Sequence, residues 1–118
     1  MQSPWRSGRR PMANNYRQKG HTFQHETADL WRDHGHHVSQ LQRNLADTGD
    51  NMIRTPHGVT LAEETKRRER LSIPEWWKQT CKDAPDGSVP VLTFRQSRRE
   101  SLTVIRTADL ARLLAGQR

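Results

Sequence analysis

Cysteine is almost absent from this chain of 118 residues, which contains only Cys81. An internal disulfide is therefore impossible, and this excludes the small secreted domains that disulfides hold together. A single thiol instead favours a reducing compartment such as the cytoplasm.

Hydrophobic residues are also scarce, at 31% of the chain with a mean hydropathy of −1.05. No apolar run approaches the roughly 20 residues that span a membrane, and the N-terminus lacks the apolar segment of a secretory signal. We therefore expect no membrane partner and a single domain with a small core. Some of the chain is expected to form a tail or to pack against a partner subunit.

Acidic residues are outnumbered, 13 against 20 Lys and Arg, so the formal charge is +7 and the isoelectric point about 10.7. This balance favours a polyanionic partner, most simply nucleic acid, and predicts salt-sensitive binding. A basic protein with no nucleic-acid role is the plainer alternative. Residues 1–19 contain basic but no acidic side chains, which predicts a flexible basic arm before a domain over residues 20–118. An unstructured extension, with Met12 as the first residue, is the other interpretation.

Apolar periodicity and turn residues predict an α/β fold, a mixed sheet flanked by helices. The expected helices cover 22–34, 72–82 and 107–115, and the expected strands cover 38–45, 51–55, 60–68, 89–95 and 102–106. A capping box of Ser72 and Glu75 is expected to start the second helix. The last helix is expected to begin with Thr107 as its cap. Its buried stripe is expected to consist of Leu110, Leu113 and Leu114.

The strand predicted at 60–68 contains the residues on which a function can be built. Side chains alternate on a strand, so Glu64 and Lys66 should lie on one face and Glu63 on the other. A carboxylate and an ammonium group placed in this way can hold a divalent metal ion and steady an attacking water or a phosphate oxygen. Asp50 supplies the second carboxylate that Mg²⁺ commonly uses.

The first predicted helix offers a further acid. Glu26 lies on or beside the apolar face that includes Phe23, Leu30 and Trp31, where a carboxylate is costly unless it is paired or bound to a metal. It is therefore a candidate member of the site. The alternative is an edge position from which Glu26 reaches solvent.

Arginines surround these acids in the sequence. Three follow Glu64 and Lys66 in the sequence and three lie in or near the last hairpin: Arg67, Arg68, Arg70, Arg95, Arg98 and Arg99. An acidic pocket with a basic rim suits a phosphodiester held on a metal, so these arginines are predicted to contact nucleic acid. A solvated run of charges is the alternative.

This ordered set resembles the PD-(D/E)XK nuclease superfamily, and within it the small archaeal-type Holliday junction resolvases and the short resolvase-like endonucleases of phages and prophages. The resemblance covers about residues 20–114. The residues that carry it are Gly20 with Glu26, Gly49-Asp50, Glu64-Thr65-Lys66-Arg67-Arg68, and Pro74-Glu75-Trp76-Trp77-Lys78-Gln79 followed by Val89-Pro90-Val91-Leu92. One departure from the family pattern is that proline does not precede Asp50, which leaves Asp47 as a competitor for its role.

The resemblance implies a restriction-endonuclease-like αβββαβ core and metal-dependent hydrolysis of DNA phosphodiesters. It implies branched DNA as the substrate, a homodimer, and the cytoplasm of a bacterial or phage-infected cell. By resemblance, Asp50 and Glu64 bind Mg²⁺, with Mn²⁺ as an alternative ion. Lys66 supports the nucleophilic water, Glu26 assists the metal site, and Gln79 matches a glutamine often seen on the family's second helix.

Two other functions stay open at this point. A non-catalytic DNA-binding protein on a degenerate nuclease fold would use the same basic surface, but it has no physical reason to keep two acids and a lysine together. A nuclease acting on linear or nicked DNA would share the chemistry and differ only in the shape of its substrate.

Overall fold

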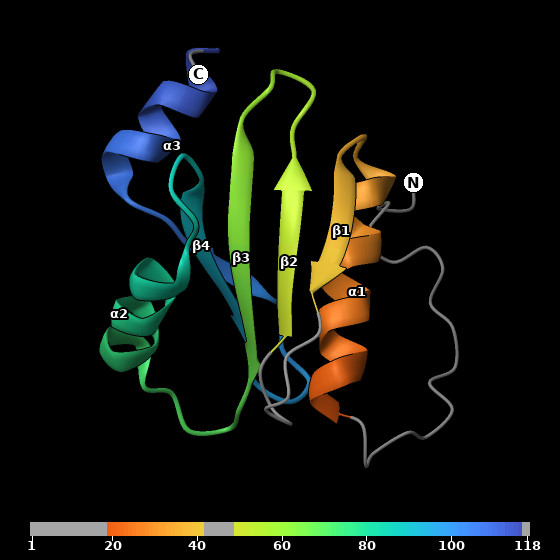
Figure 1. Ribbon diagram of the computed structural model, residues 1–118. Coiled ribbons are helices and arrows are strands. Elements are labelled where there is room, and N and C mark those ends of the chain that lie inside the picture. The colour runs from red at the N-terminus through yellow and green to blue at the C-terminus, as the bar shows by residue number, and fades with distance from the viewer. Residues whose placement is uncertain (1–18, 42–48, 117–118) are drawn as a thin grey trace.

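The computed structural model describes residues 19–41 and 49–116, which form a five-stranded mixed sheet and three helices (Figure 1). The helices are α1 (Lys19–Asp33), α2 (Ile73–Asp83) and α3 (Thr107–Leu114), and the strands are β1 (His37–Leu41), β2 (Gly49–Arg54), β3 (Thr60–Arg67), β4 (Val89–Arg95) and β5 (Leu102–Val104). The predicted α/β class and the order of elements are confirmed.

The predicted basic arm, apart from Lys19, and the competing Asp47 lie outside the described residues. In the described ranges no helix is long and apolar enough to cross a membrane.

The strands lie side by side in the order β1-β2-β3-β4-β5. β2 is antiparallel to both β1 and β3. The hairpin between β2 and β3 includes Gly58, whose φ of +88° suits a residue without a side chain. β3 and β4 are parallel, so the chain must cross over between them, and α2 forms this crossover. β5 pairs antiparallel with β4 at the edge of the sheet.

Different helices cover the two faces of the sheet. One face, termed the α2 face, carries alternate side chains of β2, β3 and β4: Asp50, Met52, Ala62, Glu64, Lys66 and Phe94. The opposite α1 face carries the intervening side chains Asn51, Ile53, Leu61, Glu63 and Thr93. Trp76 of α2 packs against Phe94 with ring centroids 6.4 Å apart, whereas Thr27 and Trp31 of α1 hydrogen-bond to Glu63. The prediction that Glu64 and Lys66 share a face is confirmed.

Buried hydrophobic residues are few, as the scarcity of apolar residues predicts, and one cluster of them lies on the α1 face, whereas Ala62 and Phe94 are buried on the α2 face. The buried members of the cluster are Ala28, Val38, Ile53, Val59, Leu61 and Val91. Trp31 of α1 and Leu113 of α3 pack against this cluster while remaining partly buried. Polar side chains fill much of the remaining interior, among them Gln24, Asn51 and Glu63. These polar groups must therefore be satisfied by hydrogen bonds within the protein.

The prediction that α3 buries three leucines is wrong. Leu113 packs against the core, but Leu110 and Leu114 are 43% and 79% exposed, whereas Asp109 is 6% exposed. Asp109 and Leu113 lie one helical turn apart, so turning this pair inward rotates the other two leucines outward. Asp109 can be buried because its carboxylate is paired with Arg112 on the same helix.

Two predicted helix caps are not formed by side chains. Ser72 is the N-cap of α2, but its side chain makes no capping hydrogen bond, so the expected capping box with Glu75 is absent. Pro74 in the first turn has no N–H and leaves one donor fewer to satisfy. At α3 the N-cap is Arg106, and Thr107 is already the first residue of the helix. Both helices therefore begin without the side-chain stabilisation that the sequence suggested.

Candidate functional site

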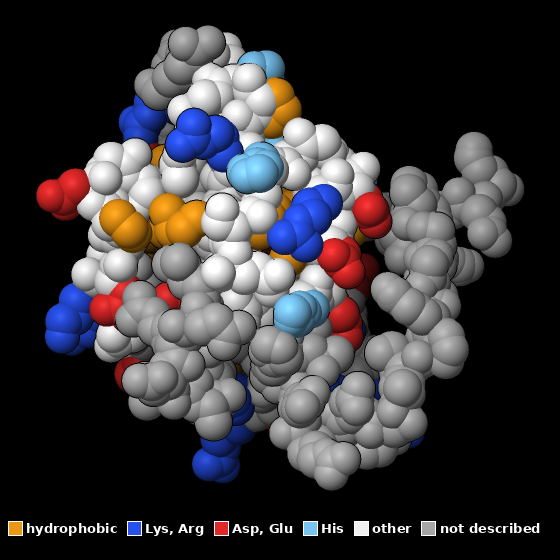
Figure 2. All heavy atoms as spheres, turned by 45° about the vertical axis from the view of Figure 1, so that its right-hand side comes forward, with side chains coloured by type: hydrophobic (Ala, Val, Ile, Leu, Met, Phe, Trp, Pro, Cys, Tyr) orange, Lys and Arg blue, Asp and Glu red, His pale blue; other side chains and the backbone are white. Residues whose placement is uncertain are grey.

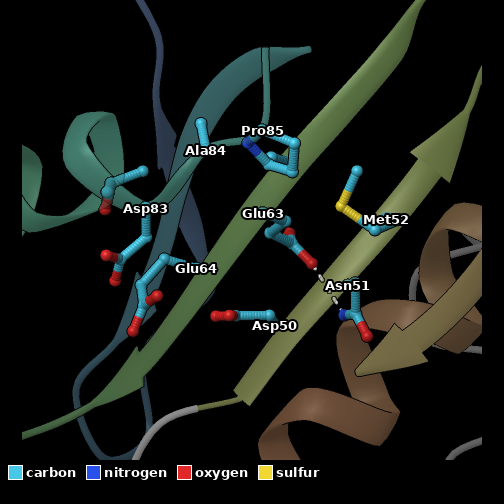
Figure 3. A pocket seen from close by; sticks show the side chains of 10 residues that line it. Asp50, Asn51, Met52, Glu63, Glu64, Asp83, Ala84 and Pro85 are labelled. Carbon is cyan, nitrogen blue, oxygen red and sulfur yellow. Dashed lines mark hydrogen bonds between the residues drawn. The ribbon is translucent and has the colours of Figure 1, made fainter. Parts of the chain in front are cut away.

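Asp50 on β2 and Glu64 on β3 lie directly opposite each other. They are register partners of the antiparallel strand pair, and Figure 3 shows their carboxyl groups turned toward each other. Both residues are buried, at 8% and 5% exposure. Lys66, two residues further along β3, brings its Nζ to 3.7 Å from Glu64 Oε2. The structure thus brings together three of the four residues predicted for the catalytic site.

Burial and neighbouring carboxylates raise the pKa of Glu64 to about 8. Removal from water is the largest cause, followed by a hydrogen bond with Asp50 and the negative charge of Asp50. Asp83 raises this pKa further, and Lys66 acts in the opposite direction. At neutral pH Glu64 therefore retains its proton and shares it with Asp50 through their hydrogen bond.

Without divalent cations in solution, the protein is expected to lose stability as the pH rises from about 4.5 to about 8. In this interval the unfolded chain releases the Glu64 proton while the folded protein retains it, so the folded state binds more protons and rising pH favours unfolding. Since one pKa unit corresponds to about 1.4 kcal/mol, the free energy of unfolding should fall by on the order of 3–4 kcal/mol across the interval. Glu64→Gln should remove this contribution.

Urea denaturation in EDTA, at several pH values between about 5 and 8, measures the effect. Other ionisable groups are the same in both proteins, so the difference between wild type and Glu64→Gln isolates Glu64. The same pH slope in both proteins would contradict the raised pKa.

A pocket on the α2 face adds another acid, Asp83, the last residue of α2. The pocket is lined by Asp50, Asn51, Met52, Ala62, Glu63, Glu64, Thr80, Asp83, Ala84 and Pro85 (Figure 3). The Asp83 carboxylate accepts a hydrogen bond of 2.8 Å from Gln79 Nε2. Sequence reasoning missed Asp83, because only the crossover of α2 between β3 and β4 brings it beside Glu64. Gln79 adjoins the site through Asp83, and a functional role for Gln79 stays a prediction.

Glu26, the fourth predicted catalytic residue, is not brought into this group. Its Oε2 lies 3.1 Å from Nη1 of Arg95, and the Arg95 guanidinium lies 5.1 Å from the centroid of the Phe23 ring. Arg95 is two residues from Thr93 on β4 and shares its α1 face. Because α1 packs on this face, Glu26 is separated by the sheet from Asp50 and Glu64.

A second buried carboxylate belongs to Glu63, the residue before Glu64, and its side chain lies on the opposite face of the sheet. No structural role was predicted for Glu63 from the sequence. It is 1% exposed. Its Oε1 accepts hydrogen bonds from Thr27 (3.2 Å) and Asn51 (2.8 Å), and its Oε2 accepts from Trp31 (2.9 Å) and Thr93 (2.6 Å). Burial raises the pKa of Glu63, and these four hydrogen bonds oppose the rise. One side chain thus connects α1, β2, β3 and β4.

The Glu63 contacts also fix the register of the site. Asn51 and Glu63 are register partners on the α1 face, directly beside the pair of Asp50 and Glu64 on the α2 face. A slip of one residue between β2 and β3 would turn one strand over and place the members of each pair on opposite faces of the sheet. The buried hydrogen bond between Asn51 and Glu63 therefore favours the one register in which the two acids of the candidate site meet.

The six predicted nucleic-acid contacts lie at one end of the sheet. Since β3 and β4 are parallel and Arg67 pairs with Arg95 in register, both strands and the loops after them end on the side of Lys66. Arg70, Arg98 and Arg99 are exposed in those loops. By contrast, the side of the molecule that includes α1 and β1 has acidic, basic and histidine side chains interspersed over its described part (Figure 2). A basic end thus adjoins the buried acids.

Comparison with known proteins finds no family model that matches the chain and no curated protein that matches its sequence. The function must therefore be argued from the arrangement of the residues themselves.

Proposed function

We propose that the protein is a metal-dependent endodeoxyribonuclease, with α1 to β4 as a restriction-endonuclease-like αβββαβ core. The observation that carries the proposal is the cross-strand pair of Asp50 and Glu64, with Lys66 Nζ 3.7 Å from Glu64. Two acids and a lysine meet on one face beside a basic end of the sheet. Hydrolysis of a phosphodiester on a metal ion needs this combination of charges.

The donor set fits Mg²⁺ or Mn²⁺. Asp50 and Glu64 are close enough to share a hydrogen bond, and each would otherwise place a negative charge in a buried position. A divalent cation would offset both charges, as the proton on Glu64 offsets one. Among the described residues no three His, Cys, Asp or Glu side chains come close enough to hold an ion together. Water and substrate phosphate would therefore complete the coordination, which is usual for Mg²⁺.

The residues of this site divide the chemical work between them. When bound, the metal would polarise the scissile phosphate and lower the pKa of a water molecule. Asp50 and Glu64 would hold the ion, after Glu64 gives up the proton that it shares with Asp50. Lys66 would orient the attacking water through Nζ and offset the negative charge that develops on the phosphate. Water attacks directly in this scheme, so no serine or cysteine nucleophile is needed.

We propose DNA as the substrate, branched DNA as its preferred form and a homodimer as the working unit. The exposed arginines beside Lys66 would contact the phosphate backbone, which supplies most of the affinity in salt-sensitive DNA binding. Resolution of a four-way junction requires two cuts, and a symmetric dimer would supply one site for each.

One observation favours a second candidate function, a non-catalytic DNA-binding protein on a degenerate nuclease fold. Glu26, which the family resemblance assigns to the metal site, is paired with Arg95 on the other face of the sheet. The set of acids is therefore one short of the family pattern. Under this alternative the basic end would bind DNA, and the pair of Asp50 and Glu64 would catalyse nothing.

Cleavage of a labelled four-way DNA junction beside a matched linear duplex tests the proposal. Each DNA would be incubated with wild type and with Lys66→Ala, in Mg²⁺ and in EDTA. We expect paired symmetric nicks in the junction, abolished in EDTA and reduced at least about 10²-fold in the variant, because the charge on Nζ is lost.

Three outcomes separate the alternatives. Cutting of linear duplex alone would retain the chemistry and remove the junction as substrate. DNA binding without cutting, in Mg²⁺ and in Mn²⁺, would favour the non-catalytic protein. Cleavage that persists in both EDTA and Lys66→Ala would refute the assigned site.

A further inference from the structure

Two loops that carry exposed arginines are joined at the basic end of the sheet. The first loop follows β3 and contains Arg68 and Arg70, and the second follows β4 and contains Arg98 and Arg99. An acidic residue, Glu69, lies between the two arginines of the first loop. An acid is unexpected at a surface proposed to bind phosphate, so its contacts need an explanation.

Glu69 binds the second loop through both its backbone and its side chain. The Gln96 side chain donates to the Glu69 carbonyl oxygen at 2.7 Å. The Ser97 amide donates to Glu69 Oε2 at 3.0 Å, and the Ser97 hydroxyl donates to the same oxygen. Beside these contacts, the Arg68 amide donates to the Arg95 carbonyl oxygen at 3.2 Å. The two loops are therefore held together from the last residues of β3 and β4 outward.

The residue after Ser97 has a backbone conformation that needs support. Arg98 has a φ of +63°, which lies in the left-handed region that side chains disfavour. The turn is closed by the Arg99 amide, which donates to the Gln96 carbonyl oxygen at 3.2 Å. Because Glu69 holds Ser97, inside this turn, it also holds the directions in which Arg98 and Arg99 leave the loop.

We propose that Glu69 is a positioning residue for DNA, which holds the arginines of both loops as one phosphate-binding edge beside Lys66. The inference rests on the proposed DNA-cleaving function and deepens it. If the two loops are already ordered, their arginines can contact successive phosphates without the loops having to become ordered on binding. Less conformational entropy is then lost on binding than with mobile loops. Lys66 precedes Glu69 by three residues, so this edge begins at the end of the strand that carries Lys66 and Glu64.

The proposal predicts a change in affinity opposite in sign to that expected from charge alone. Removing an acid from a phosphate-binding surface should strengthen DNA binding, because repulsion is lost. If Glu69 positions the arginines, its removal should weaken binding although the protein becomes more basic. The two explanations are therefore separated by the direction of a single measurement.

Two substitutions of Glu69 separate its charge from its hydrogen bonds. Glu69→Ala removes both, and Glu69→Gln removes the charge but keeps an oxygen that accepts from Ser97. Glu100→Ala is the matched control, because it removes an exposed acid from the second loop itself. Affinity for a labelled duplex is measured with full-length protein in EDTA, so that no cleavage occurs, at several salt concentrations.

We expect Glu69→Ala to weaken DNA binding about 5- to 10-fold. The salt slope, which is the decrease of log affinity with log salt concentration, should become shallower by the amount that corresponds to the loss of about one to two phosphate contacts. Glu69→Gln should stay within about twofold of wild type, and Glu100→Ala should bind equally or more tightly. Ser97→Ala, which changes no charge, should weaken binding in the same direction as Glu69→Ala. If Glu69 only stabilised the fold and did not position the arginines, the number of phosphate contacts would stay the same, and so would the salt slope.

Equal or tighter binding by Glu69→Ala would overturn the inference, and so would an unchanged salt slope. If Glu69→Ala unfolds, Ser97→Ala decides the question by the same criteria. The proposed function fails separately: wild type that neither binds nor cuts DNA refutes both proposals. Wild type that cuts DNA while Glu69→Ala behaves like Glu100→Ala refutes only the role of Glu69.

Discussion

Asp50→Asn is expected to lower the rate of DNA cleavage by at least about 10³-fold while DNA affinity stays within about threefold of wild type. Asparagine keeps the shape of the side chain opposite Glu64 but lacks the negative charge that would hold a divalent cation. Loss of that charge removes several kcal/mol of transition-state stabilisation, and each 1.4 kcal/mol is about tenfold in rate. Single-turnover cleavage at saturating protein measures the chemical step apart from binding.

Asp83→Asn is the matched control for this experiment. Asp83 lines the same pocket and raises the pKa of Glu64, but it stands at the end of α2 and is not a proposed ligand. We expect Asp83→Asn to slow cleavage by no more than about tenfold, because the substitution changes only the electrostatic potential around Asp50 and Glu64. Similar losses in both variants would place Asp83 among the ligands. Activity of Asp50→Asn within tenfold of wild type would remove Asp50 from the site.

Glu63→Ala is expected to lower the free energy of unfolding by about 4 kcal/mol, a large fraction of the stability of a domain of this size. The substitution leaves a cavity and removes the acceptor of four side chains on α1, β2 and β4. Buried donors without an acceptor, such as Asn51 Nδ2 and Trp31 Nε1, are what make such a change severe. Urea denaturation in metal-free buffer measures the loss.

Two variants control for other effects of removing a glutamate. Glu75→Ala, at the exposed start of α2, should cost no more than about 1 kcal/mol, because Ser72 and Glu75 form no capping box. Glu63→Gln keeps one acceptor oxygen and should lose less stability than Glu63→Ala. Should Glu63→Ala prove as stable as Glu75→Ala, the buried network would not hold α1 to the sheet.

The parts of the site that were predictable from sequence depend on local geometry. Side-chain alternation on one strand is a property of the backbone, so Glu64 and Lys66 could be placed together without knowing the fold. Asp50 could be assigned because a short hairpin returns the chain to the same strand pair. The element order likewise follows from periodicity and turn residues, which act over a few positions.

The parts that were not predictable depend on contacts between distant elements. Nothing near Glu26 specifies which face of the sheet α1 covers, so its separation from the acids appears only in the folded chain. Asp83 reaches the pocket only because α2 crosses between two parallel strands. In α3 the leucine pattern was misleading, since Asp109 is neutralised by an arginine on its own helix and can be buried in place of a leucine.

The short strand at the β4 side of the sheet affects how the protein resists aggregation. An exposed edge strand offers unpaired N–H and C=O groups on which a strand of another molecule can assemble. β5 is the edge strand here, and it spans only Leu102–Val104 before the chain turns into α3. Its few backbone N–H and C=O groups can form few hydrogen bonds with a strand of another molecule. Growth of the sheet from one molecule into the next is therefore disfavoured at this edge.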